Sequence, residues 1–357
     1  MTTTVVVIGA GQSGLSAAAA LRDLGVTPLV LEAGTEPVGS WPHYYDSLTL
    51  FSPARHSGLS GLPFFGDGDR YPHRDEVVEQ LRRFAARLDV EIRTQTRVEA
   101  VHPDGHGGFV LHTTAGETIS AAGVVAASGS FGNPHRPELP GQETFTGELS
   151  HVADYRDPAG YAGKRVVIVG AGNSAVQIAF ELSASAAVTL ATRAPLAFLP
   201  QIRDGRDFHD WIAASGFDLL PAHWLAPVVG GTLVVDIGDY RAALESGRIA
   251  RKEMFQALDG DHVRWSDGTA EQIDAVLLAT GYRPDLRYLE PIGALDASGS
   301  PLHIGGISTA CPGLVYVGLE LQRSFSSNTL RGVRHDVDHV VPVLAAHVRQ
   351  AHKTVGF

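Results

Sequence analysis

Cysteine is almost absent from this chain, since Cys311 is the only one among its 357 residues. A single thiol excludes a disulfide within the chain, a cluster of thiolate ligands around a metal ion and a Cys-x-x-Cys redox pair. Any electron-transfer chemistry in this protein must therefore proceed without a second thiol from the same chain.

Excess positive charge and long apolar runs are also missing. The chain has 28 basic and 39 acidic residues, so the electrostatic footprint of a nucleic-acid-binding protein is absent. No run of about 18 apolar residues occurs, as a membrane-spanning helix requires, and no basic segment precedes the apolar residues 5–8. These features predict a cytoplasmic protein with neither nucleic acid nor a membrane as a partner.

What the sequence does contain is apolar material for folded domains. Hydrophobic residues make up 44% of the chain, and the length suits two ordinary domains. A disordered or fibrous protein is therefore excluded.

The N-terminal residues combine a β-branched run with a glycine-rich turn. Residues 4–8 predict a strand, residues 9–14 read Gly-Ala-Gly-Gln-Ser-Gly, and the small, Ala-rich residues 15–24 predict a helix. A second predicted strand, residues 29–31, ends at Glu32. Strand, glycine turn, helix and acid together predict a dinucleotide-binding unit.

The residue types found in this turn and at Glu32 can be explained physically. Gly9 permits the tight bend, Gly11 lets the backbone approach a pyrophosphate, and Gly14 lets helix and strand pack closely. The helix N-terminus offers backbone N–H groups and a positive dipole end to the phosphates. The Glu32 carboxylate can accept hydrogen bonds from ribose hydroxyls.

The same pattern recurs later in the chain. Residues 165–169 predict a strand, residues 170–175 read Gly-Ala-Gly-Asn-Ser-Ala, and a helix follows over residues 176–182. The next predicted strand, residues 188–191, ends at Thr192-Arg193. The two halves of the chain are therefore expected to be built alike.

The two copies differ in charge at the ribose position. Arg193 follows Ala175 at the same spacing at which Glu32 follows Gly14. An acid favours an unmodified 2′-hydroxyl, whereas a guanidinium can pair bidentately with a 2′-phosphate. The first site is therefore predicted to be FAD-like and the second NADP-like, with a solvated surface arginine as the alternative interpretation of Arg193.

Two further apolar strands indicate how the domains are connected. Residues 123–127 end in Ser128-Gly129, residues 275–279 end in Thr280-Gly281, and each is followed by a proline-containing loop. We interpret these as the points where the chain leaves the first domain and returns to it. The predicted fold is α/β with two Rossmann-like dinucleotide-binding domains, the NAD(P)H domain (163–275) being inserted into the FAD domain (1–162 and 276–357).

Two histidines near the C-terminus are spaced as a metal-binding pair would be. His335 and His339 lie at positions i and i+4 of a helix predicted from about Asn328. A third ligand is not evident nearby, so a solvated or structural role is favoured and no metal site is predicted.

The residues between the two fingerprints carry a family resemblance. Residues 145–155 read Phe-Thr-Gly-Glu-Leu-Ser-His-Val-Ala-Asp-Tyr, which resembles the linker signature of flavin-containing monooxygenases. Gly39-Ser40-Trp41, residues 47–53, the turn at residues 96–98 and residues 278–281 also resemble that family. The resemblance covers essentially the whole chain and is nearest to the short bacterial members that use NAD(P)H.

This resemblance implies a chemistry that the cofactors carry out. NADPH reduces FAD, O2 adds to the flavin C4a to give a (hydro)peroxide, and that intermediate oxygenates soft nucleophiles such as sulfides and amines, with Baeyer–Villiger oxidation of ketones as a further activity. The implied partners are a small-molecule substrate and O2, and the expected assembly is a homodimer. No side-chain nucleophile or general base is required.

The resemblance also implies which residues lie at each site. At the flavin site these are Gly9, Gly11, Gln12, Ser13, Gly14, Glu32, Ser40, Trp41, Val98, Ser128 and Gly129. At the nicotinamide site they are Gly170, Gly172, Asn173, Ser174, Ala175, Thr192 and Arg193. Thr280 and Gly281 are further cofactor-binding residues, in a segment that resembles the flavin-facing region of the family. The candidates facing the flavin are Trp41 and Phe51, and His151 is either a linker residue that couples the cofactor to domain orientation or a purely structural one.

One departure from the family pattern concerns the flavin-facing segment. Members usually place an Asn over the flavin where this chain reads Leu-Thr-Leu-Phe-Ser-Pro over residues 48–53, which offers Phe51 instead. Short bacterial relatives with similar departures are less strict about the nicotinamide cofactor. Because Thr192-Arg193 keeps the phosphate contact, we expect a preference for NADPH with some use of NADH.

Three other functions were weighed against the monooxygenase. A disulfide reductase of the thioredoxin-reductase type needs a cysteine pair, which Cys311 alone cannot form. A dedicated Baeyer–Villiger enzyme carries a related linker that usually ends in Trp, where this chain has Tyr155. An NADPH-dependent flavin reductase, oxidase or electron-transfer flavoprotein stays open, as does the role of the irregular segment 203–231, which either walls the substrate entrance or packs as an insertion.

Overall fold

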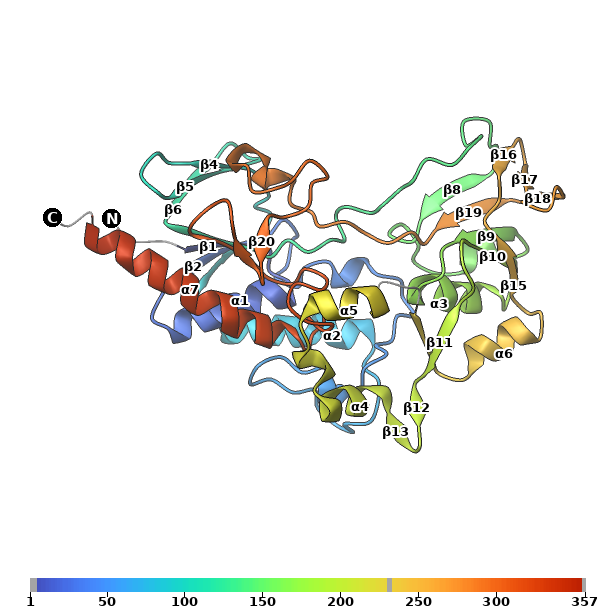
Figure 1. Cartoon of the computed structure of the whole chain (residues 1–357), viewed down its shortest axis with the longest axis horizontal. Coiled ribbons are helices and arrows are strands. Elements are labelled where there is room, and N and C mark those ends of the chain that lie inside the picture. Colours follow the sequence, from blue (N-terminus) through green and yellow to red (C-terminus); the bar gives the residue numbers. More distant parts are fainter. Residues whose placement is uncertain (1–4, 230–232, 355–357) are drawn as a thin grey trace.

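The computed structural model describes residues 5–229 and 233–354. It contains two parallel sheets, each with helices on one face and a three-stranded antiparallel sheet on the other (Figure 1). We call the seven-stranded sheet with its covering layers the first half, and the five-stranded sheet with its layers the second half. The α/β class with two Rossmann-like units is therefore confirmed.

The sheet of the first half is parallel at its centre and antiparallel at one edge. Its strand order is β20-β21-β22-β7-β1-β2-β3, and all pairs from β22 to β3 are parallel. The central strands are fully buried valine-rich runs, as expected for strands covered on both faces. The strands are β1 (Val5–Ile8), β2 (Pro28–Leu31), β3 (Glu91–Arg93), β7 (Gly123–Ala126), β20 (His303–Ile304), β21 (Ile307–Ser308) and β22 (Leu314–Tyr316).

Different layers cover the two faces of this sheet. One face packs against α1 (Gln12–Asp23), α2 (Arg74–Arg87) and α7 (Val333–Thr354), and α1 also contacts α7 directly. The other face packs against the small sheet β4 (Val98–Pro103), β5 (Phe109–Thr113) and β6 (Thr118–Ala121), together with the 3-10 helix η5 (Arg287–Ile292).

The second half repeats this arrangement with five parallel strands. Its order is β15 (Ala250–Glu253), β10 (Ala187–Thr192), β9 (Arg165–Val169), β19 (Ala275–Leu278) and β8 (Glu148–His151). One face packs against α3 (Asn173–Leu182) and α6 (Asp239–Glu245). The other packs against β16 (Ala257–Asp259), β17 (His262–Arg264) and β18 (Ala270–Gln272).

One segment leaves the second half and lies on the first. The paired strands β11 (Ala197–Pro200) and β14 (Leu233–Asp236) flank it. We call residues 201–224 the strap; they include β12 (Ile202–Arg203), β13 (Arg206–Asp207), α4 (Phe208–Ser215), η4 (Phe217–Leu219) and the start of α5 (Ala222–Val229). In Figure 1, α4 and α5 lie beside α2 and α7, whereas β11 lies with the second half. The remaining 3-10 helices are η1 (Trp41–His43), η2 (Ala54–His56) and η3 (Ala159–Tyr161).

One expectation about an element is corrected. The last helix begins at Val333 rather than near Asn328, because the residues before it form turns in which the Gly332 N–H is donated to the Thr329 carbonyl. Within the linker signature, residues 148–151 form β8 at the edge of the second sheet. The domain boundaries at 162/163 and 275/276 stay predictions, but both β8 and β19 belong to the second sheet.

Membrane insertion by a helix has no support in the fold. Across the two described ranges, each helix is either too short or too polar to cross a bilayer.

Candidate functional site

The first glycine turn leaves the N-terminus of α1 open. The helix follows Gly11, which has no side chain to cap it, and its first turn contains no acidic residue. The first-turn N–H groups of a helix have no acceptor within the helix itself. The N-terminus of α1 can therefore donate hydrogen bonds to an anion.

Steric contacts explain why two of the turn positions are glycine. Gly9 has a φ of +102°, and a Cβ there would lie 2.5 Å from the Ala127 carbonyl oxygen. At Gly14 a Cβ would lie 1.8 Å from the Gly9 carbonyl oxygen. The turn, the neighbouring strand β7 and the first turn of α1 are thus packed backbone to backbone.

Glu32 is buried at the end of β2 and is held by the backbone. Its Oε2 accepts a hydrogen bond from Ala10 N at 2.7 Å, and its Oε1 accepts one from Gly34 N at 2.7 Å. The side chain therefore has a fixed orientation, while each carboxylate oxygen keeps further accepting capacity. This matches the demand of a ribose that presents two hydroxyl donors.

These groups meet in one cavity of about 610 Å³, within the range of small-molecule sites. It lies over the carboxyl ends of β1, β2 and β7, where open α/β sheets bind ligands. Nine of the residues predicted for the flavin site line it: Gly9, Gly11, Gln12, Ser13, Glu32, Ser40, Val98, Ser128 and Gly129. Their contact with a cofactor remains a prediction, but the open helix, the buried acid and the glycine cradle fit a dinucleotide.

The other two candidates near the flavin lie outside the cavity lining. Trp41 stands behind it, with its indole Nε1 donating to Gln12 Oε1 at 2.9 Å. Phe51 is 37% exposed, and its ring lies 5.9 Å from the His209 ring in the strap. The Phe51 carbonyl also accepts a hydrogen bond from Gln201 Nε2 at 2.9 Å.

Several lining residues were missed by the sequence analysis. Arg97 and Arg287 line the wall, and neither forms an ion pair with any described residue. Tyr44, Phe131 and Asn328 line it as well. These residues belong to no recurring sequence pattern, so their places become clear only in the folded chain.

An aromatic chain connects this cavity to the second half. The ring centres of Tyr44 and Phe131 are 4.7 Å apart, those of Phe131 and Tyr282 5.4 Å, and those of Tyr282 and His151 5.2 Å. The cavity wall therefore continues directly into the end of β8.

His151 is fully buried, and both ring nitrogens are engaged. Its Nδ1 accepts a hydrogen bond from Ala153 N at 3.0 Å, so Nε2 carries the proton and donates to the Gly281 carbonyl at 3.2 Å. Burial lowers the pKa of His151, and the nearby Arg136 adds to the effect. A neutral imidazole thus ties the end of β8 to the turn after β19, which favours the structural interpretation.

The second glycine turn repeats the first. Gly170 has a φ of +143°, and a Cβ there would lie 2.3 Å from the Ala279 carbonyl oxygen. The helix α3 follows Gly172 with no side-chain cap and no acid in its first turn, so its N-terminus is also open. Asn173 Oδ1 accepts a hydrogen bond from Val235 N at 2.9 Å, which fixes β14 beside the turn.

The remaining residues predicted to bind a cofactor lie around this turn. Ser174 and Ala175 belong to the first turn of α3, and Ala175 is buried against the sheet where the first fingerprint has Gly14. Thr280 Oγ1 donates to the His135 carbonyl, and Gly281 accepts from His151 as described. These contacts place Thr280 and Gly281 at the crossing between the halves.

The end of β10 carries the predicted phosphate-reading pair. Thr192 is buried, whereas Arg193 is exposed and has no hydrogen-bond or ion-pair partner in the described part of the chain. Thr192 Oγ1 accepts a hydrogen bond from Arg251 Nε at 2.8 Å. Arg251 was missed because the polar run Ala250–Glu253 does not have the composition of a typical strand.

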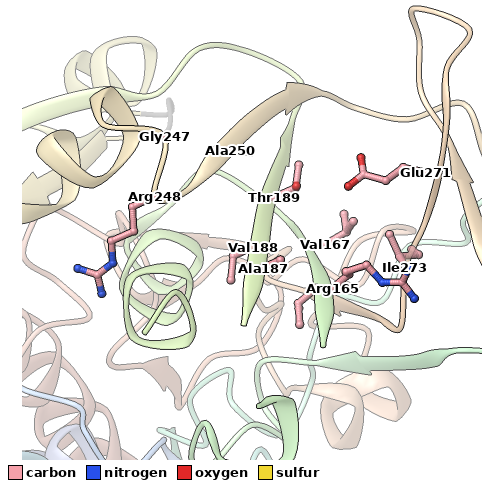
Figure 2. A pocket seen from close by; sticks show the side chains of 11 residues that line it. Arg165, Val167, Ala187, Val188, Thr189, Gly247, Arg248, Ala250, Glu271 and Ile273 are labelled. Carbon is pink, nitrogen blue, oxygen red and sulfur yellow. The ribbon is translucent and has the colours of Figure 1, made fainter. Parts of the chain in front are cut away.

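Two other cavities lie away from these turns. One of about 250 Å³ is at the amino ends of β9 and β10, at the opposite edge of the sheet from the fingerprint (Figure 2). The other, of about 620 Å³, lies between the strap and the first half and is lined by residues such as Leu59, Ile212, Leu219 and Arg331.

Cys311 and His335 are two further residues that the sequence singles out. The Cys311 thiol is half-buried and donates to the Ile292 carbonyl, and burial raises its pKa. Within the ranges that the structure covers, no group of three or more His, Cys, Asp or Glu side chains is placed to hold a metal ion. His335 instead lines the cavity beneath the strap.

Two Rossmann-like halves, each with an open glycine turn, are the architecture of an oxidoreductase. A family model described as pyridine nucleotide-disulphide oxidoreductase matches residues 6–203. The chain is 31% identical to a flavin-containing monooxygenase from Stenotrophomonas maltophilia, covering 99% of this chain and 100% of that one, with a TM-score of 0.82.

Two curated relatives extend the comparison. An indole-3-pyruvate monooxygenase, YUCCA1 of Oryza sativa subsp. japonica, is 31% identical over 79% of this chain and 77% of its own length. An uncharacterized CzcO-like oxidoreductase of Geobacillus kaustophilus is 29% identical over 96% and 98%. The chain therefore belongs to the flavin-containing monooxygenases, within the pyridine nucleotide-disulphide oxidoreductase family, and uses a flavin and a nicotinamide cofactor.

Proposed function

We propose that the first cavity binds FAD. The observation that carries this proposal is the meeting of the open α1 N-terminus with the buried Glu32 in one cavity of about 610 Å³. The helix end would hold the pyrophosphate, and Glu32 would accept from the adenosine ribose. Arg97 and Arg287 supply the positive charge that a diphosphate requires on its other side.

The second glycine turn is proposed to bind NADPH, with NADH tolerated. An open α3 N-terminus again faces the expected pyrophosphate position, and the unpaired Arg193 follows β10 where the first half has Glu32. Positive charge at this position favours a 2′-phosphate over a 2′-hydroxyl.

O2 is the proposed electron acceptor, and a small soft nucleophile such as a thioether or amine is the proposed substrate. When bound, the flavin would take a hydride from the nicotinamide and pass electrons to O2. In balance, NADPH, a proton, O2 and a thioether give NADP+, water and a sulfoxide. The lone Cys311 lies outside the cavity lining, which supports oxygen rather than a disulfide as acceptor.

Ketone oxidation of the Baeyer–Villiger type is the second candidate. It needs the same cofactors and the same half-reaction with O2, so the fold serves both. Tyr155 stands where the linker of dedicated ketone oxidases usually has Trp. Its hydroxyl donates to Glu181 Oε2 at 2.7 Å, which anchors the linker on α3.

The cofactor assignment is tested by denaturing the purified holoprotein and identifying the flavin that is released. FAD is expected, without a covalent link. FMN would contradict the proposal, because it has no adenosine half for Glu32 to hold.

Oxygen transfer is tested with NADPH, a prochiral thioether and ¹⁸O2. Labelled sulfoxide is the expected product, analysed by mass spectrometry together with amine and cyclic ketone panels. If NADPH is consumed and only hydrogen peroxide forms across all three panels, the protein is an NADPH oxidase or reductase and the monooxygenase proposal is wrong.

A further inference from the structure

Arg251 stands at the end of the strand that carries the predicted phosphate-reading residues. Strands β10 and β15 are parallel, with Leu190 opposite Arg251 and Thr192 opposite Glu253. The Arg251 side chain reaches along the sheet toward its carboxyl edge, since Nε donates to Thr192 Oγ1 at 2.8 Å. Arg193 is the next residue after Thr192, so the chain brings two arginines to the end of β10.

The donors of these two arginines are not used elsewhere in the described residues. Other arginines of the second half are engaged: Arg165 pairs with Asp274 and Arg264 with Asp259, while Arg241 and Arg248 lie over the rings of Phe198 and Phe180. Arg193 has no such partner, and Arg251 commits only its Nε. Both side chains are exposed at the sheet edge and keep free N–H groups for a ligand.

The bond to Arg251 also sets the direction of the Thr192 hydroxyl. Thr192 is buried, so its hydroxyl anchors the exposed Arg251 side chain. The edge therefore presents two exposed arginines in a chain whose formal net charge is −11.

We propose that Arg251, held in place by the Thr192 hydroxyl, binds the 2′-phosphate of the nicotinamide cofactor together with Arg193, so that Arg251 is a second specificity-determining residue. This inference rests on the proposed use of NADPH. Glu253 is the opposing feature, because alternate residues of a strand share a face and its exposed carboxylate lies at the same edge. That carboxylate limits the preference and gives a reason for residual use of NADH.

Binding of nucleotide fragments tests the inference without turnover. Isothermal titration of the holoenzyme with 2′,5′-ADP and with 5′-AMP separates the 2′-phosphate from the rest of the adenosine site. Arg251→Gln is expected to weaken 2′,5′-ADP binding by roughly ten- to a hundredfold, the range of a charge-assisted contact, with 5′-AMP changed by less than about twofold. Arg251→Lys is expected to restore part of the loss, because Lys keeps the charge without the planar fork.

Arg248→Gln is the matched control. Arg248 lines the cavity at the opposite end of the sheet, where Figure 2 shows its side chain. This substitution is expected to leave the binding of both nucleotides unchanged. Glu253→Gln is expected to tighten 2′,5′-ADP binding only.

The outcomes separate this inference from the proposed function. If the wild-type protein and Arg193→Gln differ as expected for 2′,5′-ADP but Arg251→Gln binds like the wild type, Arg251 only braces Thr192 and the inference is overturned. An equal loss for both nucleotides in Arg251→Gln overturns it as well. A wild-type protein that does not distinguish the two nucleotides contradicts the use of NADPH itself.

Discussion

His151 shows how one buried imidazole joins the linker signature to the turn after β19. Both nitrogens are engaged only when the ring is neutral, with Nδ1 accepting from Ala153 and Nε2 donating to Gly281. Protonation would place a hydrogen on Nδ1 that faces the Ala153 N–H. This position therefore requires a side chain that accepts a hydrogen bond at one end and donates one at the other, which no aliphatic side chain can do.

The neutral state of His151 predicts a pH dependence of stability. Because burial lowers its folded-state pKa, the unfolded chain binds the proton more readily once the pH falls below about 6.5. Stability should therefore decrease as the pH falls from 7.5 to 5.5. His151→Asn keeps an acceptor for Ala153 N and cannot be protonated. The stability that this variant loses between pH 7.5 and 5.5 should therefore be smaller by about 1 kcal/mol.

Denaturant unfolding at several pH values measures this difference. At pH 7.5 the variant should already be about 1 kcal/mol less stable, since the bond to Gly281 is lost. His106→Asn, at an exposed turn, is the control and should follow the wild type. If the stability of His151→Asn changes with pH in parallel with that of the wild type, protonation of His151 does not contribute to the pH dependence.

At the residue scale, the sequence allowed prediction of positions whose identity is dictated by the backbone. Gly9 and Gly14 could be predicted because a tight turn and a close packing contact each demand glycine, and the position of Glu32 at the end of β2 followed from the same pattern. Tyr44 and Arg251 could not, because many residues suit a loop or an edge strand. Their roles depend on which segments fold against them, and that is set by the tertiary structure.

Among the elements, the strap has the most concentrated polar contacts with a different part of the chain. Asp207 accepts hydrogen bonds from Tyr71 Oη and Gln201 Nε2, each at 2.6 Å, and from both the backbone N–H and the ring of His209. Burial alone would raise the pKa of Asp207, but these donors outweigh it and hold the pKa well below its usual value. Asp207 also caps α4, so one carboxylate both starts the helix and fixes it to the first half.

Replacing Asp207 with Asn should loosen the strap without unfolding the rest. The asparagine NH2 group would point its two hydrogens at groups that also donate, so at least one buried donor loses its acceptor. The expected cost is about 2–3 kcal/mol. Native-state proteolysis within residues 203–219 should then be roughly 30- to 160-fold faster. Ser215→Ala, at the far end of α4, is the control and should change the rate little. Equal rates for the two variants would show that Asp207 does not fasten the strap.

At this scale the regular elements were predictable and the strap was not. The two fingerprints gave β1, β2, β9 and β10 to within one or two residues, since fully buried parallel strands are continuous apolar runs. The path of the strap depends on pairs between distant residues, such as Arg331 with Asp218 at 2.9 Å. Neither residue carries any sign of its partner in the sequence.

For the molecule as a whole, the single thiol gives a direct test of the electron path. Cys311→Ser should keep both NADPH oxidation and oxygen transfer within about twofold of the wild type, because the thiol is half-buried and bonded to Ile292. Turnover before and after treatment with iodoacetamide should also agree. Loss of NADPH oxidation in a folded, flavin-loaded Cys311→Ser protein would bring the disulfide reductase back into consideration.

The strap also determines how the two halves can move. The chain crosses between them twice on one side, after β7 and after β19, and the strap reaches back on the other, where Arg331 and Tyr71 hold it (Figure 1). Tyr45 adds a contact between them, since its hydroxyl donates to Gln177 Oε1 at 2.6 Å. Contacts on both sides oppose a change in the angle between the halves, so a nicotinamide bound to the second half would keep a restricted range of positions over the first cavity.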